Sequence, residues 1–188
     1  MEARECLLNR RSVRRYLSDP VPDEVLERIM ECALAAPSAT NRQHWYFVVV
    51  RSPEGMEELH RIMKGMEETV LPAVMKQYAR FPEVAAETVA FLRGFGNAPA
   101  CVLAFCLKPE YSTEAGRQSV CAAIENLLLG AWSEGVGTCW MAAPWGIAPQ
   151  LQERYAPGKG DFVAAISLGY PERVPAMPAR KPGRCEYI

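Results

Sequence analysis

The stretch Ala100-Cys101-Val102-Leu103-Ala104-Phe105-Cys106-Leu107 is an unbroken apolar run without a charged residue. A short run of this kind is typical of a β-strand that is buried on both faces. Trp45–Val50 is a second such run, rich in aromatic and β-branched residues, and we expect it to be central in the sheet. Cys101 and Cys106 should lie on opposite faces of their strand, as small buried residues rather than metal ligands.

A long helix is predicted between the second and third strands. Its apolar positions recur at helical spacing and are Val120, Ile124, Leu127, Leu128 and Ala131. Because this stripe is continuous, the helix should bury one whole face and form the spine of the core. Gly135-Val136-Gly137 ends it, and Thr138–Ala142 and Phe162–Leu168 have the composition of two further strands.

Other helices are expected before the first strand and between the first two strands. Pro22-Asp23-Glu24 has the form of a helix start, and Pro37 stops the helix that follows it. Residues 54–95 carry helix formers interrupted by turn signals, which predicts two or three helices. Prolines recur from Pro171 onward, so residues from about 171 to 188 should form an extended tail that can reach a partner chain.

Composition limits the class of protein. The chain has 188 residues, 49% of them hydrophobic, and we expect a single α+β domain spanning residues 1–188. Its 21 Lys and Arg balance 22 Asp and Glu to a net charge of -1, which offers no bulk attraction to nucleic acid or to an anionic membrane. No apolar run approaches the roughly 18 residues of a membrane helix. Seven cysteines without a C-x-x-C pair indicate reduced thiols and a cytoplasmic protein.

The usual patterns of protein-borne catalysis are missing. The two histidines, His44 and His60, do not form an H-E-x-x-H zinc site. Neither a G-x-S-x-G elbow nor a P-loop is present in the sequence. We therefore expect no metal, and if the protein is an enzyme, a bound cofactor should carry the chemistry.

The basic stretch Arg10–Arg15 suits a phosphate group, because guanidinium groups match phosphate oxygens and Ser12 adds a hydroxyl donor. If the stretch is extended, Arg10, Ser12 and Arg14 share one face of it. Arg11 and Arg15 would then point away. A solvated basic turn, or a surface patch that touches nucleic acid, would have the same composition.

Two further segments favour binding of a flat heterocycle, although each has a simpler interpretation. Pro37–Trp45 places amide and hydroxyl groups between a helix end and a strand start, as a plain loop would also do. Gly135-Val136-Gly137-Thr138-Cys139-Trp140 lets the backbone approach a ligand closely, but a glycine-capped helix end has the same pattern.

Taken in order, these segments resemble the nitroreductase family of flavoproteins. Arg10-Arg11-Ser12-Val13-Arg14 is similar to the opening phosphate motif of that family, and Ala36–Trp45 is similar to its A-P-S-x-x-N-x-Q-P-W loop. Gly135–Trp140 resembles the G-L-G-T-x-W turn of the family. Leu168-Gly169-Tyr170-Pro171, with Arg180-Lys181-Pro182, resembles its closing signature, so the likeness spans residues 10 to 182.

The resemblance implies a three-layer α/β/α fold with a central, mostly antiparallel sheet and two intertwined chains that build FMN sites between them. The cofactor-binding residues that it implies are Arg10, Arg11, Ser12, Arg14, Pro37, Ser38, Asn41, Gln43, Trp145, Gly146, Arg180 and Lys181. By that likeness, Arg10, Ser12 and Arg180 hold the phosphate, with Arg11 and Lys181 assisting. Arg14 approaches the pyrimidine side of the flavin, and a backbone N–H of Trp145 or Gly146 faces N5.

By the same likeness, the loop residues Pro37, Ser38 and Asn41 come from the partner chain, and Gln43 meets the ring edge. No protein residue acts as a nucleophile, because flavin N5 accepts the hydride. The implied reaction passes hydride from NADH or NADPH through FMN to a nitroaromatic, a quinone or a similar conjugated acceptor. Candidate walls of the substrate pocket are Tyr78, Phe91, Phe95 and Trp145, which would otherwise belong to the core.

Two alternatives to an enzyme are open. An FMN carrier or sensor would bind flavin without nicotinamide turnover, and a nucleic-acid-binding protein would use Arg10–Arg15 with strong salt dependence. The sequence also departs from the family pattern at two positions. His44 replaces the usual proline, and we expect its imidazole to face the surface. Ser119 replaces an acid, which puts in doubt any structural hydrogen bond that the acid would make.

Overall fold

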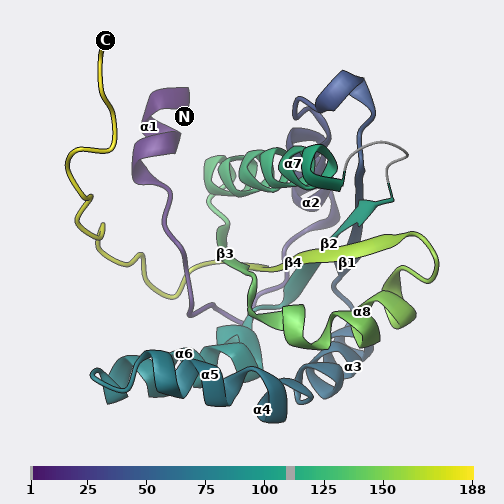
Figure 1. Cartoon of the computed structure of the whole chain (residues 1–188), viewed down its shortest axis with the longest axis vertical. Coiled ribbons are helices and arrows are strands. Elements are labelled where there is room, and N and C mark those ends of the chain that lie inside the picture. Colours follow the sequence, from purple (N-terminus) through teal and green to yellow (C-terminus); the bar gives the residue numbers. More distant parts are fainter. Residues whose placement is uncertain (1, 109–112) are drawn as a thin grey trace.

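A four-stranded antiparallel sheet forms the centre of residues 2–108 and 113–188, which the computed structural model describes (Figure 1). Its strands are β1 (Trp45–Val50), β2 (Ala100–Leu107), β3 (Gly137–Met141) and β4 (Gly160–Gly169). They lie in the order β1-β2-β4-β3, and every neighbouring pair is antiparallel. The α+β class and the positions of all four strands are therefore confirmed to within two residues.

The prediction that Trp45–Val50 is central in the sheet was wrong, because β1 is an edge strand. The four residues in the middle of β1 are only half-buried, whereas β2 is buried along almost its whole length. An apolar run shows that a strand is covered by side chains on its faces. It does not show whether a second strand pairs with each edge, since pairing is decided by distant parts of the chain.

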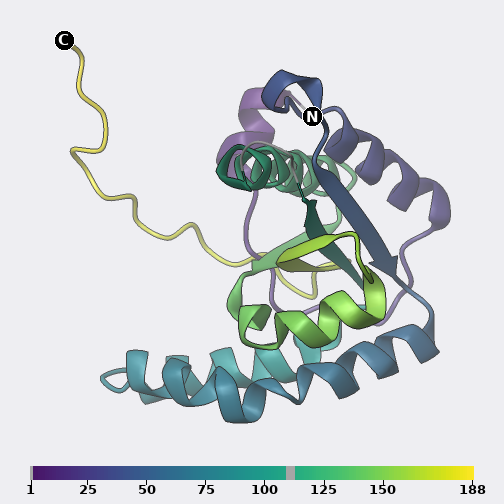
Figure 2. The same cartoon turned by 45° about the vertical axis from the view of Figure 1, so that its right-hand side comes forward.

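Helices cover both faces of the sheet, which gives three layers (Figures 1 and 2). One face carries α7 (Thr113–Ser133) and α2 (Asp23–Leu34), with α1 (Ala3–Asn9) packed against α7. The other face carries α3 (Pro53–Met63), α4 (Met66–Thr69), α5 (Leu71–Gln77), α6 (Pro82–Gly94) and α8 (Ala148–Tyr155). Three short 3-10 turns, η1 (Ala39–Asn41), η2 (Phe95–Asn97) and η3 (Ala143–Ile147), join these elements. Among the described helices, we find none with the length and apolar character needed to cross a membrane.

The alternation of side chains along the strands produces two hydrophobic cores. Val102 and Ala104 face α7, while Leu103 and Phe105 face the α3 to α6 layer. Cys101 and Cys106 are buried in different cores, as the spacing predicted. On α7 the predicted apolar stripe is fully or almost fully buried, so this helix is the spine of its core. Burying each large side chain contributes about 1.5–3 kcal/mol.

The basic segment, defined here as Arg10–Tyr16, crosses the end of the sheet between β3 and η2. Backbone hydrogen bonds of 2.9 Å run from Val13 N to Thr138 O and from Tyr16 N to Gly96 O. The Tyr16 side chain is buried, and its hydroxyl lies 2.6 Å from Val13 O and 2.8 Å from Ser167 Oγ. Burial raises the pKa of Tyr16, so this hydroxyl stays protonated and can donate.

Glycines make room for the basic segment at each place where it touches the body. A Cβ on Gly96, where φ is +62°, would overlap the carbonyl group of Arg14. A Cβ on Gly137 would lie 2.7 Å from Val13 Cγ2, and one on Gly169 would lie 3.2 Å from Tyr16 Cδ1. The path of the segment therefore depends on missing side chains in β3, in β4 and after α6.

Residues after Pro171 form the extended tail that the prolines predicted. Leu17 N donates to Tyr170 O at 2.9 Å, and Glu172 N donates to Arg15 O at 3.0 Å, so the basic segment anchors the base of the tail. Beyond Pro175 every residue is exposed, and the tail leaves the body of the molecule (Figures 1 and 2).

Replacing Gly96 by alanine should destabilise the protein much more than replacing Gly135 by alanine. Both glycines have a left-handed φ, +62° and +74°, and that conformation alone costs alanine about 1 kcal/mol. Only Gly96 also faces a backbone carbonyl, whereas a Cβ on Gly135 meets nothing within 4 Å. The overlap should add about 1–3 kcal/mol to the loss for Gly96→Ala, measured as the free energy of unfolding in urea. Equal losses for the two variants would contradict the close approach.

Candidate functional site

A cavity of about 730 Å³ brings several predicted site residues together. Ser12 and Arg14 of the basic segment line one side, and Tyr78 and Phe91 of the α5 to α6 region line another. Arg173, at the base of the tail, lines a third. A cavity of this size suits a small organic ligand or cofactor, for which roughly 300–1,000 Å³ is usual.

The basic segment presents donors to this cavity because it is extended and anchored at both ends. Ser12 forms a parallel bridge with Thr138 of β3, which fixes the backbone at the cavity edge. Arg14 has no ion pair with an acid among the described residues, and its guanidinium carbon lies 5.9 Å from the centre of the Phe91 ring. Arg15 lines the cavity as well, although alternation predicted that it would point away.

Arg10 and Arg11 lie at the end of α1 and do not line the cavity. Arg10 Nε is 3.5 Å from Glu125 Oε1 on α7, which is a partly exposed ion pair. The Arg11 guanidinium donates to Leu8 O at 2.9 Å and to Arg10 O at 2.8 Å. Arg11 therefore satisfies carbonyl groups at the end of α1, as basic residues near helix ends commonly do.

The loop that contains Pro37, Ser38, Asn41 and Gln43 lies beside the N-terminal half of α7, on the opposite side of the sheet from α6 (Figures 1 and 2). Within one chain it does not contribute to the cavity. Asn41 and Gln43 have φ of 54° and 51°, a conformation that is costly for residues other than glycine. Such strain is often stored at functional loops, and here Gln43 N donates to Ser38 Oγ at 2.9 Å.

Ser119 ties this loop to α7. Its hydroxyl accepts a hydrogen bond from Ala39 N at 3.1 Å and donates to Ala115 O at 2.7 Å. The departure from the acid of the family pattern therefore leaves a structural hydrogen bond to the loop in place.

The expectation that His44 faces the surface was wrong, because its side chain is only 6% exposed. Its Nδ1 has no hydrogen-bond partner among the described residues, and its carbonyl accepts a 2.7 Å bond from Leu107 N. The residue directly precedes β1, so pairing of its backbone with the end of β2 draws the imidazole under the surface. The presence of histidine at the proline position of the family motif gives no information on this backbone pairing with β2.

Phe95 and Trp145 do not line the cavity, although both were candidate walls. Phe95 is fully buried in the core and packs on the His60 ring at 5.1 Å. Burial lowers the pKa of His60, which keeps this imidazole neutral against the aromatic ring. Trp145 lies in η3 and is 70% exposed. Its backbone N–H donates to Ala142 O at 3.1 Å, and Gly146, the other predicted donor, does not line the cavity.

Arg180 and Lys181 lie on the exposed tail. Neither makes a hydrogen bond or an ion pair with the described residues, and the tail diverges from the body before it reaches them (Figures 1 and 2). One chain by itself therefore does not bring Arg180 against Arg10.

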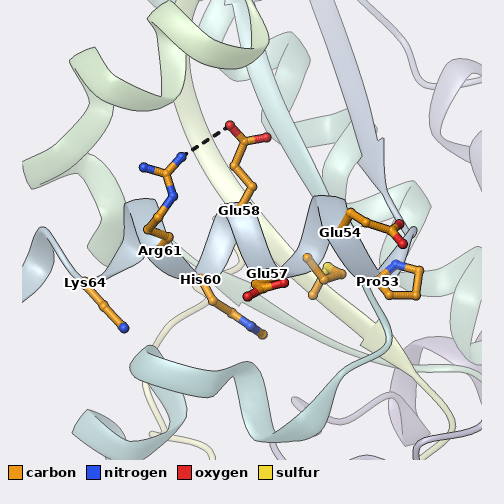
Figure 3. A pocket seen from close by; sticks show the side chains of 8 residues that line it. Pro53, Glu54, Glu57, Glu58, His60, Arg61 and Lys64 are labelled. Carbon is orange, nitrogen blue, oxygen red and sulfur yellow. Dashed lines mark ion pairs between the residues drawn. The ribbon is translucent and has the colours of Figure 1, made fainter.

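A second hollow, of about 590 Å³, runs along α3 and is lined by that helix alone (Figure 3). Glu58 and Arg61 form an ion pair of 3.5 Å there, while Glu57 and His60 point to the other side of the helix. None of the predicted site residues lines it, so we assign it no function.

Eight residues that line the main cavity escaped sequence interpretation: Val84, Glu87, Thr88, Ala90, Asn97, Glu172, Arg173 and Pro175. Thr88 precedes Phe91 by one helical turn, so both residues lie on the same face of α6. This spacing indicates a cavity residue only once α6 is known to face the basic segment. Asn97 has a φ of 65° and follows the Gly94-Phe95-Gly96 turn, which the sequence showed only as a break.

Comparison with known proteins connects this geometry with a family. Residues 7–170 match the Nitroreductase family. A "Putative NADH dehydrogenase/NAD(P)H nitroreductase" of Archaeoglobus fulgidus is 29% identical over 181 residues, covering 89% of this chain and 86% of that protein. A "Putative NAD(P)H nitroreductase YfhC" of Bacillus subtilis is 26% identical over 186 residues, covering 96% of this chain and 90% of that protein.

A solved structure shows the same arrangement of elements. The BluB-like flavoprotein of Clostridium difficile is 26% identical, has a TM-score of 0.80, and aligns over 100% of this chain and 99% of its own. The family match covers most of the chain and includes the basic segment, the loop at residues 37–44 and the turn before β3. The chain therefore belongs to the Nitroreductase family.

Proposed function

We propose that the protein is an FMN-dependent oxidoreductase, which passes hydride from NADH or NADPH to a nitroaromatic, a quinone or a similar conjugated acceptor. The observation that carries the proposal is the cavity that Ser12 and Arg14 line together with the aromatic residues Tyr78 and Phe91. The side chains that line this cavity include both polar donors and apolar walls, as in sites for flat cofactors and planar substrates. The flavoprotein and nitroreductase names of the relatives support the same assignment.

The residues present fit FMN. Ser12 supplies a hydroxyl for the phosphate, and Arg10 is close by at the end of α1. The Arg10–Glu125 pair is long and partly exposed, so it is weak and a phosphate can displace the carboxylate. Arg14, which has no acidic partner among the described residues, is free to face the pyrimidine side of the ring.

When bound, FMN would supply the hydride-accepting atom N5, and the chain's own groups would set its surroundings. Arg14 would stabilise the negative charge that reduction places on the pyrimidine side of the ring. A backbone N–H of Trp145 or Gly146 would donate to N5. Tyr78 and Phe91 would cover the space above the ring, where a planar nicotinamide or acceptor stacks.

The site should be completed by a second copy of the chain. The outer edge of β1 pairs with no strand of the described residues, although its middle residues are apolar and half-buried. Exposed apolar side chains recur on α1 and on the tail: Leu7, Leu8, Val174, Met177, Tyr187 and Ile188. A homodimer would cover these groups, and it would bring Pro37, Ser38, Asn41 and Gln43 from the partner to the cavity.

An FMN carrier or sensor is the alternative. It would use the same phosphate and ring contacts without nicotinamide turnover.

Protein purified with FMN should be yellow, and anaerobic NADH or NADPH should bleach the flavin absorption. A conjugated acceptor such as a quinone should then restore the colour, because the reduced cofactor passes its hydride on. The measurement is the absorption spectrum during titration. Bound flavin that neither nicotinamide bleaches would favour the carrier.

Arg180→Ala should lower the affinity for FMN about tenfold or more, because it removes a charge-assisted hydrogen bond to the phosphate. Arg184→Ala is the matched control, since Arg184 lies on the same exposed tail outside the family signature. The dissociation constant is measured by quenching of flavin fluorescence. Equal affinities in both variants would sink the assignment of the tail to the phosphate.

The full chain should sediment with twice the mass of one chain, whereas a chain that ends at Arg173 should sediment as a weaker dimer or a monomer. The physical reason is that residues 174–188 carry large apolar side chains that are exposed in a single chain: Val174, Met177, Tyr187 and Ile188. Arg184→Ala, which changes the tail without removing any of these apolar side chains, serves as the control. A monomeric full chain in analytical ultracentrifugation would refute the dimer.

A further inference from the structure

Arg14 is long, flexible and exposed, yet the proposed function needs its charge at one place beside the ring. Its backbone is held firmly, since its carbonyl rests on Gly96 and Tyr16 N donates to Gly96 O at 2.9 Å. A fixed backbone does not fix a guanidinium, because an arginine side chain has several rotatable bonds. Some group at the cavity must therefore restrict it.

Phe91 is the group placed to do so. Its ring is 7% exposed and belongs to the core, so neighbouring side chains hold it in place. The Arg14 guanidinium carbon lies 5.9 Å from the ring centre, within the roughly 6 Å over which a cation is attracted to an aromatic face. Phe91 is one helical turn before Phe95 and Gly96, so the connection that clamps the Arg14 backbone also positions the ring.

Cys139 of β3 is a second buried group near the Arg14 guanidinium. Burial raises the pKa of the Cys139 thiol, and the Arg14 charge beside it is the largest opposing influence. Cys139 is 3% exposed and faces the same core as Phe91. The guanidinium therefore lies near both a buried ring and a buried thiol, and it has no carboxylate partner among the described residues to draw it elsewhere.

We infer that Phe91 is a positioning residue whose ring holds the Arg14 guanidinium at the cavity, where the charge stabilises reduced flavin. This inference rests on the proposed function and adds to it the residue through which Arg14 acts. Phe91 also lines the cavity, but its effect on the flavin potential is transmitted through the guanidinium.

The test is the midpoint potential of bound FMN in four proteins: wild type, Arg14→Gln, Phe91→Leu and the double variant. Arg14→Gln should shift the potential to more negative values, because the reduced, negatively charged ring loses its cation. Phe91→Leu should shift it in the same direction by a smaller amount. The double variant should match Arg14→Gln alone, because the ring acts only through the guanidinium.

Two further variants separate positioning from simple packing. Phe91→Tyr keeps an aromatic face and should keep the wild-type potential. Phe81→Leu removes an aromatic ring that is 63% exposed at the start of α6, and it should change neither the potential nor FMN affinity. The dissociation constant of FMN is measured for each variant, and Phe91→Leu should change it much less than Arg10→Ala does, since the phosphate contacts are untouched.

The outcomes are distinguishable. If Arg14→Gln shifts the potential and Phe91→Leu does not, or if their shifts add in the double variant, the inference is overturned while the proposed function stands. If neither variant shifts the potential, Arg14 does not face the ring and the inference falls. If the wild-type protein takes up no FMN, the proposed function fails, and the inference fails with it.

Discussion

The passage of the basic segment across the end of the sheet is the constraint on which the rest of the structure depends. Tyr16 enters the core, and its hydroxyl binds both Val13 O and Ser167 Oγ, so one side chain joins the segment to β4. Gly96 and Gly137 leave the space through which the backbone passes. A side chain at either position would push the segment away from the sheet.

The same constraint forms the cavity. Because the segment is extended and anchored at Thr138 and Gly96, Ser12 and Arg14 are presented at one edge. The bond to Gly96 also holds the end of α6, which brings Phe91 opposite Arg14. The contacts that stabilise the basic segment therefore also shape the proposed binding site. Substitutions that loosen the segment should disturb the cavity before they unfold the sheet.

One chain builds only part of the site that we propose. The cavity contains Ser12 and Arg14, while the loop with Asn41 and Gln43 lies across the sheet and Arg180 lies on the exposed part of the tail. The homodimer that we propose would cover both the half-buried edge strand and the exposed apolar side chains of the tail. Binding of FMN and assembly would then be coupled, because each completes surfaces that the other needs.

The sequence by itself determined the four strands, the long helix with its apolar stripe, the extended tail and the family, because each depends on local periodicity or on short motifs. Sheet order was decided only by tertiary structure, and it placed Trp45–Val50 at an edge. The burial of His44 and Phe95, and the approach of Phe91 to Arg14, were likewise decided by packing between distant segments. The physical reason is that residue type decides which side chains prefer to be buried. Which strand or side chain each one packs against depends on contacts between residues far apart in the chain.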